Sequence, residues 1–211
     1  MNELPDILKN IKVDVNNRIN EFKLIWKEAD EKRLFQELIF CILTPQSKAK
    51  NAWKAVTSLN ESGILFNATS EKISNELNIV RFKNNKARYI IDARNLFANS
   101  DGFKIRNLLN DAGDVFEKRK WLVKNVKGIG FKEASHYLRN IGFVENIAIL
   151  DRHILKNLKI YNVINEIPKS LTFGKYIRIE NKMKDFSREI NISLEFLDFV
   201  FWYKETGEIF K

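Results

Sequence analysis

The stretch Val126-Lys127-Gly128-Ile129-Gly130-Phe131-Lys132-Glu133-Ala134 decides the fold of this chain. Apolar residues such as Leu122 before it and Leu138 after it recur at helical spacing, with a Gly-Ile-Gly turn between them. Glycine suits such a turn because it reaches backbone angles that other residues avoid. The pattern predicts two short helices joined by a tight hairpin, a helix-hairpin-helix over about residues 115–141.

The same turn has the features of a phosphate-binding site. Gly128, Ile129 and Gly130 present backbone N–H groups that can approach a phosphate closely, and Lys127 adds a positive charge. The helix that follows directs the positive end of its dipole to the same place. We predict that these four residues contact the DNA backbone whatever the DNA sequence.

Composition agrees with a nucleic-acid partner. The chain has 211 residues, 45% of them hydrophobic, which is enough for one large domain or two compact lobes. Its net charge of +9 and pI near 9.5 favour a polyanion, although a basic balance alone fits equally well a protein that is merely kept soluble. The hairpin favours the first interpretation.

The single cysteine, Cys41, excludes some classes of site. It lies in the apolar run 38–43, so we expect a buried core residue, and neither an internal disulfide nor a four-cysteine zinc or iron–sulfur site can form. We therefore expect no metal and no cofactor. The sequence has no secretory core and no apolar run near the ~18 residues of a membrane span, which predicts an intracellular protein of the cytoplasm or nucleoid.

Apolar spacing predicts helices throughout the chain. The expected helices lie near residues 7–26, 31–43, 70–77, 85–97, 115–125, 151–158 and 194–203. Thr44 and Pro45 read as the N-cap and first residue of a further helix, and Pro168 introduces a long polar segment with a partial apolar stripe. Because no convincing alternating strand occurs, the predicted fold class is all-α.

The hairpin has a wider context in the chain. Asp151 follows Lys132 by nineteen residues, and His153 comes two residues later. This arrangement resembles the helix-hairpin-helix DNA glycosylase superfamily of base-excision repair. Within it, Leu43-Thr44-Pro45-Gln46 resembles the loop after the second helix of the endonuclease III group, but that group normally carries a four-cysteine cluster that this chain cannot form.

A second resemblance covers nearly the whole length. The hairpin from Lys127 to His136, and the ending from Trp202 through Gly207 to the terminal Lys211, are similar to the archaeal-type second family of 8-oxoguanine DNA glycosylases. The resemblance implies an enzyme that extrudes and excises 8-oxoguanine and then cuts the strand. Its partner would be double-stranded DNA containing that lesion, and the protein would be a monomer that needs no membrane.

The superfamily fold implies a discontinuous layout with two helical lobes. A central helical barrel would cover residues 31–130, and both termini, residues 1–30 and 131–211, would form the second lobe. The hairpin would lie at their interface and place Lys132 and Asp151 together in a cleft between the lobes.

Lys132 and Asp151 suit the chemistry of a glycosylase that is also a lyase. A neutral lysine amine can displace the damaged base and leave a Schiff base, from which β-elimination cuts the strand. The helix dipole and nearby Lys127 disfavour a cation at Lys132, and an ionised Asp151 can stabilise positive charge on the sugar. Taken alone, Lys132 would more often be a phosphate contact and Asp151 an N-cap; their pairing in this architecture favours catalysis.

Four residues are candidates for recognising the base. His136 lies one helical turn after Lys132, and Trp202 and Phe82 are aromatics that could stack on an extruded base, although capping or core roles are the simpler alternatives. The resemblance implies that Lys211 helps to tell 8-oxoguanine from guanine. Oxidation turns the N7 acceptor into an N–H donor, which a carboxylate can recognise.

Further DNA contacts are expected around the cleft. Gln46 is a candidate to fill the gap left by the extruded nucleotide or to touch the orphaned base, with an ordinary first-turn residue as the alternative. Candidate phosphate contacts on basic surfaces are Lys48, Lys50, Lys83, Lys86 and Arg88.

Two other functions fit part of this pattern. A related glycosylase for oxidised pyrimidines would share Lys132 and Asp151 and differ only in the base pocket. A non-catalytic DNA-binding module would bind duplex DNA with a steep salt dependence and never form a covalent intermediate.

Overall fold

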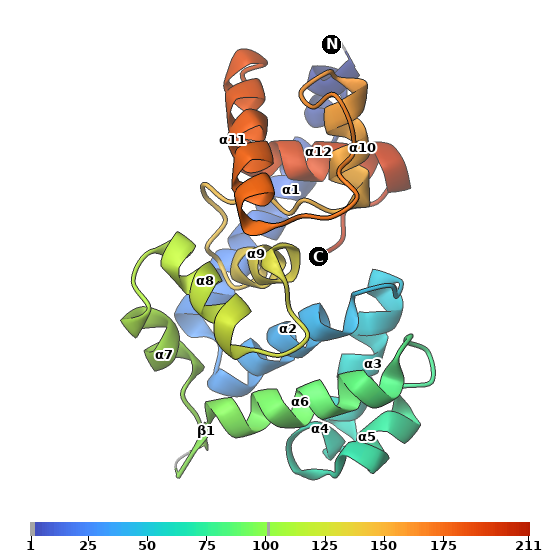
Figure 1. Cartoon of the computed structure of the whole chain (residues 1–211), viewed down its shortest axis with the longest axis vertical. Coiled ribbons are helices and arrows are strands. Elements are labelled where there is room, and N and C mark those ends of the chain that lie inside the picture. The colour runs from blue at the N-terminus through green and yellow to red at the C-terminus, as the bar shows by residue number, and fades with distance from the viewer. Residues whose placement is uncertain (1–2, 101) are drawn as a thin grey trace.

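The computed structural model describes residues 3–100 and 102–211, and it confirms the all-α prediction (Figure 1). The helices of these residues are α1 (Glu3–Glu28), α2 (Glu31–Leu43), α3 (Ala49–Glu61), α4 (Ile64–Asn67), α5 (Ser70–Glu76), α6 (Lys83–Phe97), α7 (Ile105–Asp111), α8 (Val115–Asn125), α9 (Phe131–Asn140), α10 (Arg152–Ile160), α11 (Phe173–Glu189) and α12 (Leu194–Thr206). A two-residue antiparallel pair, β1 (Ala98–Asn99) and β2 (Gly102–Phe103), was not predicted.

Local capping explains why some helices begin where the sequence predicts. Asp30 accepts a hydrogen bond from the Arg33 N–H at 2.8 Å and so begins α2. Asp114 accepts from the N–H groups of Phe116 and Glu117, both at 2.9 Å, and begins α8. Both helices therefore have the predicted bounds, 31–43 and 115–125.

The helix start predicted at Thr44 and Pro45 is wrong. Thr44 instead ends α2, because its N–H donates to the Phe40 carbonyl at 3.1 Å and its hydroxyl donates to the Cys41 carbonyl at 2.9 Å. A turn follows, and α3 begins only at Ala49. Thr44 also has helical backbone angles (φ -69°, ψ -33°), whereas an N-cap residue needs extended angles.

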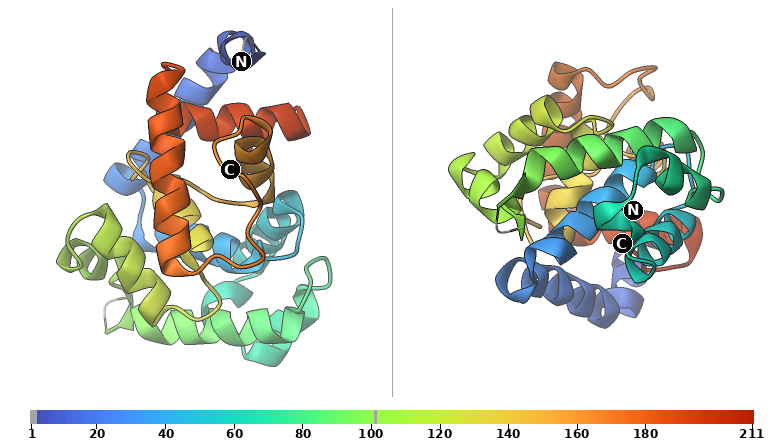
Figure 2. Two further views of the ribbon diagram at one scale, coloured as in Figure 1. Left: turned by 45° about the horizontal axis from the view of Figure 1, so that its top comes forward. Right: turned by 90° about the horizontal axis from the view of Figure 1, so that it is seen from below.

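The helices form two hydrophobic cores. One core is built mainly from α2 to α9 and the other from α1 and α10 to α12. Figures 1 and 2 (left) show α10 to α12 in the half of the molecule opposite α2 to α7, with α9 between them and α1 running from one half to the other. Cys41 lies fully buried in the first core, as predicted, and burial raises the pKa of its thiol.

The hairpin helices contact both cores. Ala134, Tyr137 and Leu138 of α9 belong to the first core, whereas Phe131 packs against the second. Helix α9 therefore packs against both cores. The predicted lobe boundaries at residues 30 and 130 stay a prediction.

A buried ion pair joins the hairpin to the second core. Arg119 on α8 makes two hydrogen bonds to Glu180 on α11, at 2.7 and 2.9 Å, and a third to the hydroxyl of Ser135 on α9 at 3.1 Å. Both charged side chains are only 1% exposed. A charge in such a place is tolerated only when its partners are fixed, so the orientation of the hairpin is tightly specified.

Within the part of the chain that the structure describes, no helix is both long and apolar enough to span a membrane.

Candidate active site and DNA-contacting surface

A cleft of about 1070 Å³ lies where the two cores meet. It is lined by the α2–α3 turn, the first residues of α9 and α10, the end of α12 and the C-terminal tail. Six of the predicted site residues line it together: Gln46, Lys132, His136, Asp151, Trp202 and Lys211.

Lys132 is the second residue of α9 and therefore sits at the helix N-terminus. Its side chain is 23% exposed, and its Nζ lies 3.9 Å from Oε1 of Glu133. Glu133 also accepts a hydrogen bond from the Gly130 N–H at 3.2 Å, which satisfies one of the free backbone donors at the start of α9. The amine is thus partly shielded, open to the cleft and carried on a rigid turn.

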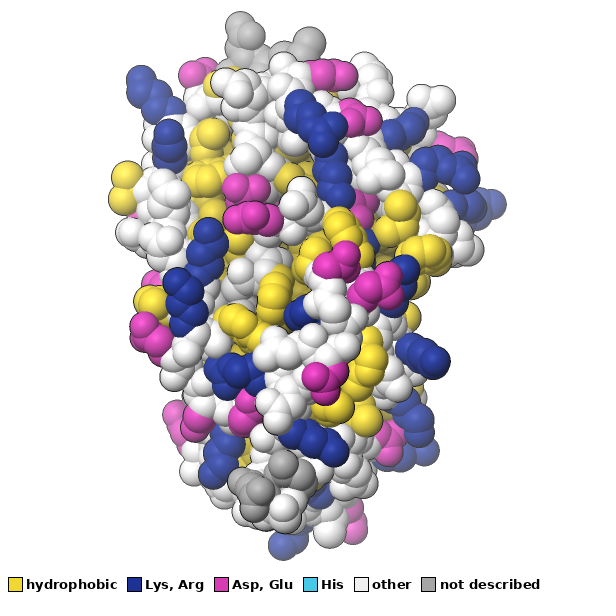
Figure 3. Space-filling view, turned by 90° about the vertical axis from the view of Figure 1, so that its left-hand side faces the viewer, with side chains coloured by type: hydrophobic (Ala, Val, Ile, Leu, Met, Phe, Trp, Pro, Cys, Tyr) yellow, Lys and Arg dark blue, Asp and Glu magenta, His cyan; other side chains and the backbone are white. Residues whose placement is uncertain are grey.

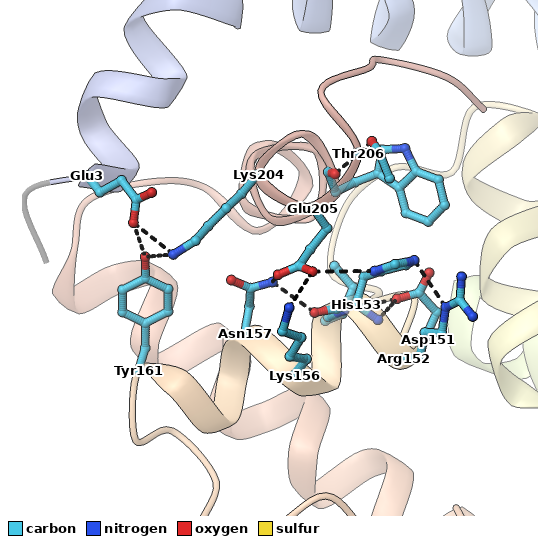
Figure 4. Close-up of polar contacts among 12 residues, drawn as sticks. Glu3, Asp151, Arg152, His153, Lys156, Asn157, Tyr161, Lys204, Glu205 and Thr206 are labelled. Atoms are coloured by element: carbon cyan, nitrogen blue, oxygen red, sulfur yellow. Dashed lines mark hydrogen bonds and ion pairs between the residues drawn. The ribbon is translucent and has the colours of Figure 1, made fainter.

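Asp151 is the N-cap of α10. Its Oδ1 accepts hydrogen bonds from the N–H groups of His153 at 2.8 Å and Ile154 at 2.9 Å. Figure 4 shows the carboxylate at the start of that helix. The simpler interpretation as an N-cap and the position in the cleft are compatible, because the cap bonds fix a carboxylate that lines the same cleft as Lys132.

His136 is a buried imidazole whose ring nitrogens have no hydrogen-bond partner among the described residues. Burial, followed by the positive charges of Arg139 and Lys132, lowers its pKa well below the usual value, so the ring is neutral. Its edge packs against Phe40, with centroids 5.3 Å apart. A neutral ring that lines the cleft without a partner can donate or accept a hydrogen bond with a bound ligand.

Trp202 is a second cleft residue with a buried polar atom that has no hydrogen-bond partner among the described residues. Its indole Nε1 is buried and, within residues 3–100 and 102–211, has no hydrogen-bond acceptor. The ring meets His153 edge to face, with centroids 5.1 Å apart. A second polar group is therefore left for a ligand in the same cleft.

The last residue of the chain is anchored inside the cleft. The Lys211 Nζ forms an ion pair with Glu37, a fully buried carboxylate on α2, and lies 3.7 Å from the centroid of the Trp53 ring. Burial lowers the pKa of the Lys211 amine to about 8. Glu37 also binds Arg33 at 2.6 Å and Asn140 at 3.2 Å, so the tail is held to the first core (C-terminus in Figure 1).

The α2–α3 turn carries Gln46 into the cleft in an unusual conformation. Gln46 is exposed and has φ +55°, a left-handed backbone that costs a non-glycine residue about 1–2 kcal/mol. The neighbouring Ser47 hydroxyl accepts a hydrogen bond from the Arg81 N–H at 3.0 Å. The strain of the turn is therefore compensated by contacts from a distant segment.

Lys86 provides most of those contacts, and its predicted role as a surface phosphate contact is wrong. The residue is only 4% exposed. Its Nζ donates to the carbonyls of Leu43 and Pro45, both at 2.8 Å, and to the Ser47 hydroxyl at 3.0 Å. Helical spacing alone could not reveal that this face of α6 is covered by the turn.

The turn of the hairpin, residues 127–130, lies outside the cleft lining. Gly128 has φ +85°, and a Cβ there would lie 2.4 Å from the Tyr89 ring, so both the backbone and the packing require glycine. Gly130 has ordinary extended angles, and Ile129 is buried. Lys127 is exposed, with its Nζ 3.1 Å from Asp92.

Phe82 does not line the cleft. It is 52% exposed, has φ +57° and precedes α6, with the Arg81 guanidinium 5.5 Å from its ring centroid. Arg81 does line the cleft, so Phe82 lies beside a cleft residue.

Sequence reasoning missed a polar network behind Asp151. Glu205 on α12 accepts from Lys156 at 2.7 Å and from Asn157 at 3.0 Å, and it lies 3.8 Å from Nδ1 of His153 (Figure 4). The hydrogen bond from Lys156 is the main reason that the pKa of Glu205 is lowered. The sequence carries no pattern that pairs His153 with Glu205, because their contact depends on the packing of α10 on α12.

A second missed pair lies in the cleft wall. Arg139 on α9 forms an ion pair with Asp198 on α12, and both line the cleft. Burial raises the pKa of Asp198 to about 6, although Arg139 opposes that shift. The pair joins the hairpin helix to the second core at a point close to the candidate chemistry.

Basic side chains do not gather on every face. On the face shown in Figure 3, Lys and Arg side chains are mixed with Asp and Glu over the whole surface. Basic side chains also line the cleft, among them Lys48, Lys50, Arg81 and Arg152.

A helix-hairpin-helix beside a cleft that holds a lysine and an aspartate is the architecture of the helix-hairpin-helix DNA glycosylase superfamily. Comparison with known proteins narrows this class. The family model described as 8-oxoguanine DNA glycosylase matches residues 15–192, and the chain belongs to that family.

Relatives match along nearly their whole length. A Fusobacterium nucleatum protein named 8-oxoguanine DNA glycosylase/AP lyase is 48% identical over 210 residues, covering 100% of this chain and 97% of the relative. A Methanocaldococcus jannaschii protein of the same name is 39% identical, covering 97% and 96%.

Solved structures agree. The crystal structure of the 8-oxoguanine DNA glycosylase of Thermotoga maritima matches with a TM-score of 0.88 at 33% identity, covering 100% of this chain and 97% of the other. The Methanocaldococcus jannaschii 8-oxoguanine glycosylase/lyase in complex with a 15mer DNA containing 8-oxoguanine matches with a TM-score of 0.88 at 36% identity, covering all of both chains.

Proposed function

We propose that this chain is a bifunctional repair enzyme that excises 8-oxoguanine from double-stranded DNA and then cuts the strand at the abasic site. The observation that carries the proposal is that Lys132, Asp151 and the unpartnered polar groups of His136 and Trp202 line one cleft. Membership of the 8-oxoguanine DNA glycosylase family supports the lesion assigned.

In this proposal Lys132 is the nucleophile. Its amine nitrogen bonds to C1′ of the sugar while the bond from C1′ to N9 of the base breaks, and the base leaves with the electron pair and takes up a proton. Opening of the sugar ring then gives a Schiff base. Loss of a proton from C2′ expels the 3′ phosphate and cuts the strand.

Asp151 stabilises the positive charge that develops on the sugar in this scheme. As the base departs, the sugar gains positive charge, and a carboxylate held by two backbone N–H groups can stabilise that charge without reorganising.

The extruded base would enter the pocket between His136 and Trp202, whose nitrogens have no other partner among the described residues. The amine of Lys211 is paired with Glu37. Lys211 would help to tell 8-oxoguanine from guanine, with a carboxylate accepting a hydrogen bond from N7–H of the oxidised base. Phe82, beside the cleft, would contact the DNA at its rim.

Duplex contacts complete the proposal. Backbone N–H groups of Gly128, Ile129 and Gly130, with Lys127, would grip a phosphate, and Gln46 would fill the gap left by the extruded nucleotide. We propose that a monomer acts on each lesion, inside the cell at the nucleoid. Two lobes, residues 31–130 and residues 1–30 with 131–211, would enclose the cleft.

Borohydride trapping tests this function. The wild-type protein is incubated with a duplex containing one 8-oxoguanine, reduced, and compared on a denaturing gel with Lys132→Gln and with Lys124→Gln, an exposed lysine on α8. We expect an adduct in wild type and Lys124→Gln and none in Lys132→Gln. An adduct that persists in Lys132→Gln would reject the nucleophile, and no wild-type adduct on this duplex, but one on an oxidised-pyrimidine duplex, would reject the lesion.

A further inference from the structure

Lys86 is a buried charged residue that the proposed chemistry does not use. It is 4% exposed, and its ammonium has three N–H bonds and three acceptors: two carbonyls and one hydroxyl of the α2–α3 turn. The acceptors are neutral groups, so Lys86 is not there to neutralise an acid. Its position satisfies the donors of an ammonium completely.

The acceptors show what Lys86 does to the turn. Leu43 is the last residue of α2, so its carbonyl is one of those left free at a helix end, where a positive charge is favourable. The Pro45 carbonyl and the Ser47 hydroxyl lie on either side of Gln46. One ammonium thus holds the turn immediately before and immediately after the residue with left-handed angles.

A second contact strengthens the same arrangement. The Ser47 hydroxyl also accepts from the N–H of Arg81, the residue that precedes Phe82 and the start of α6. The turn is therefore docked on the beginning of α6 through both a side chain and the backbone. These contacts hold the turn within the protein itself, in the absence of DNA.

We propose that Lys86 is a positioning residue, which holds the α2–α3 turn so that Gln46 points into the duplex and lowers the barrier to extruding the damaged nucleotide. This inference rests on the proposed function and extends it, because it assigns preorganisation of the inserted side chain to one residue on another helix. A group misplaced by about 1 Å can lose much of its effect on rate.

Single-turnover kinetics test the proposal. We compare Lys86→Met, which keeps the aliphatic stem and removes the donors, with Lys72→Met, an exposed lysine on α5 that loses the same charge. On 8-oxoguanine duplex, Lys86→Met should slow base excision about tenfold, whereas Lys72→Met should not. On an abasic-site duplex, which has no base to unstack, strand cutting by Lys86→Met should stay within about twofold of wild type.

A double-mutant cycle separates positioning from a general loss of structure. If Lys86 acts through the turn, adding Lys86→Met to Gln46→Ala should slow base excision little further. The excision rate of the double variant should be close to that of Gln46→Ala alone. Fluorescence of a 2-aminopurine placed opposite the lesion should report slower extrusion in both single variants. Lys86→Arg, which keeps charge and donors, should recover part of the rate.

Two results would overturn the inference. One is a folded Lys86→Met that excises at the wild-type rate; the other is defects of Lys86→Met and Gln46→Ala that multiply. If Lys86→Met fails to fold, Ser47→Ala removes one acceptor alone and should slow extrusion in the same direction by a smaller factor; no change in it would also reject the proposal. Wild-type trapping on the same duplex shows separately whether the proposed function holds.

Discussion

The hairpin and the α2–α3 turn are two tight turns near the same cleft, but they are stabilised in different ways. In the hairpin the residue with positive φ is Gly128, which adopts φ +85° without steric cost. In the α2–α3 turn it is Gln46, which adopts φ +55° against its own preference and is held there by Lys86. The comparison teaches that the conformation of a turn can follow from the preference of its own residue, as at Gly128, or can be held by contacts from a distant helix, as at Gln46.

The largest effect should come from adding a side chain to the hairpin. Gly128→Ala places a Cβ 2.4 Å from the Tyr89 ring and strains the backbone, so we expect a loss of about 2–4 kcal/mol in the free energy of unfolding. Gly130→Ala is the control, because its angles are ordinary and its new Cβ would meet only a flexible carboxylate at 3.4 Å. Denaturant unfolding measures the loss of stability in both variants. Equal losses would show that the turn does not depend on glycine at position 128 more than at position 130.

The joint between the hairpin helix and α12 should give a pH-dependent effect. The pKa of Asp198 is about 6 in the folded protein and lies above its unfolded value, so the protonated carboxyl stabilises the fold at low pH. That contribution is present below the unfolded pKa and is lost as pH rises through about 6. Wild type should therefore lose about 1 kcal/mol relative to Asp198→Asn between pH 5 and pH 7. A constant difference across those pH values would contradict this.

Relieving the strain in the α2–α3 turn should have an effect of similar or smaller size. Gln46→Gly removes the side chain and the left-handed cost together, whereas Gln46→Ala removes only the side chain. We expect Gln46→Gly to be more stable than Gln46→Ala by about 1 kcal/mol in thermal or chemical unfolding. Both should excise 8-oxoguanine more slowly than wild type. Equal stabilities would mean that Lys86 leaves no strain to relieve.

The smallest effect on stability should be at Lys127. Its contact with Asp92 joins side chains that are 70% and 41% exposed, so Lys127→Gln should change unfolding by less than about 0.5 kcal/mol. If Lys127 binds a phosphate, the slope of log affinity against log salt for duplex DNA should fall by about 0.9 in magnitude. An unchanged slope would remove Lys127 from the DNA contacts.

Local signals predicted a large part of the fold. Apolar spacing predicted α2 and α8 with the observed bounds, and the Gly-Ile-Gly stretch predicted the turn before α9, because each of these signals acts within one or two helical turns. The short helix α4 and the β1–β2 pair were missed, since segments of four and two residues carry too little periodicity to detect. Helix α7 was also missed, although α5, of the same length, was predicted.

The candidate site was predictable where it depends on residue type and spacing. Lys132 and Asp151 were named from the hairpin and from the distance along the chain, and both line the cleft. Lys86 was misjudged, and the Glu205–His153 and Arg139–Asp198 contacts were missed, because each joins segments far apart in the sequence.

The sequence by itself determined the all-α class, the hairpin with its glycine at 128, the basic charge and the candidate pair of Lys132 and Asp151. These depend on backbone preference, periodicity and residue chemistry, which act locally. Only the tertiary structure decided that Lys86 is buried under the turn of Gln46 and that Glu37 anchors the tail. The physical reason is that burial and partnership of a charge depend on neighbours brought together by packing, and no local pattern encodes those neighbours.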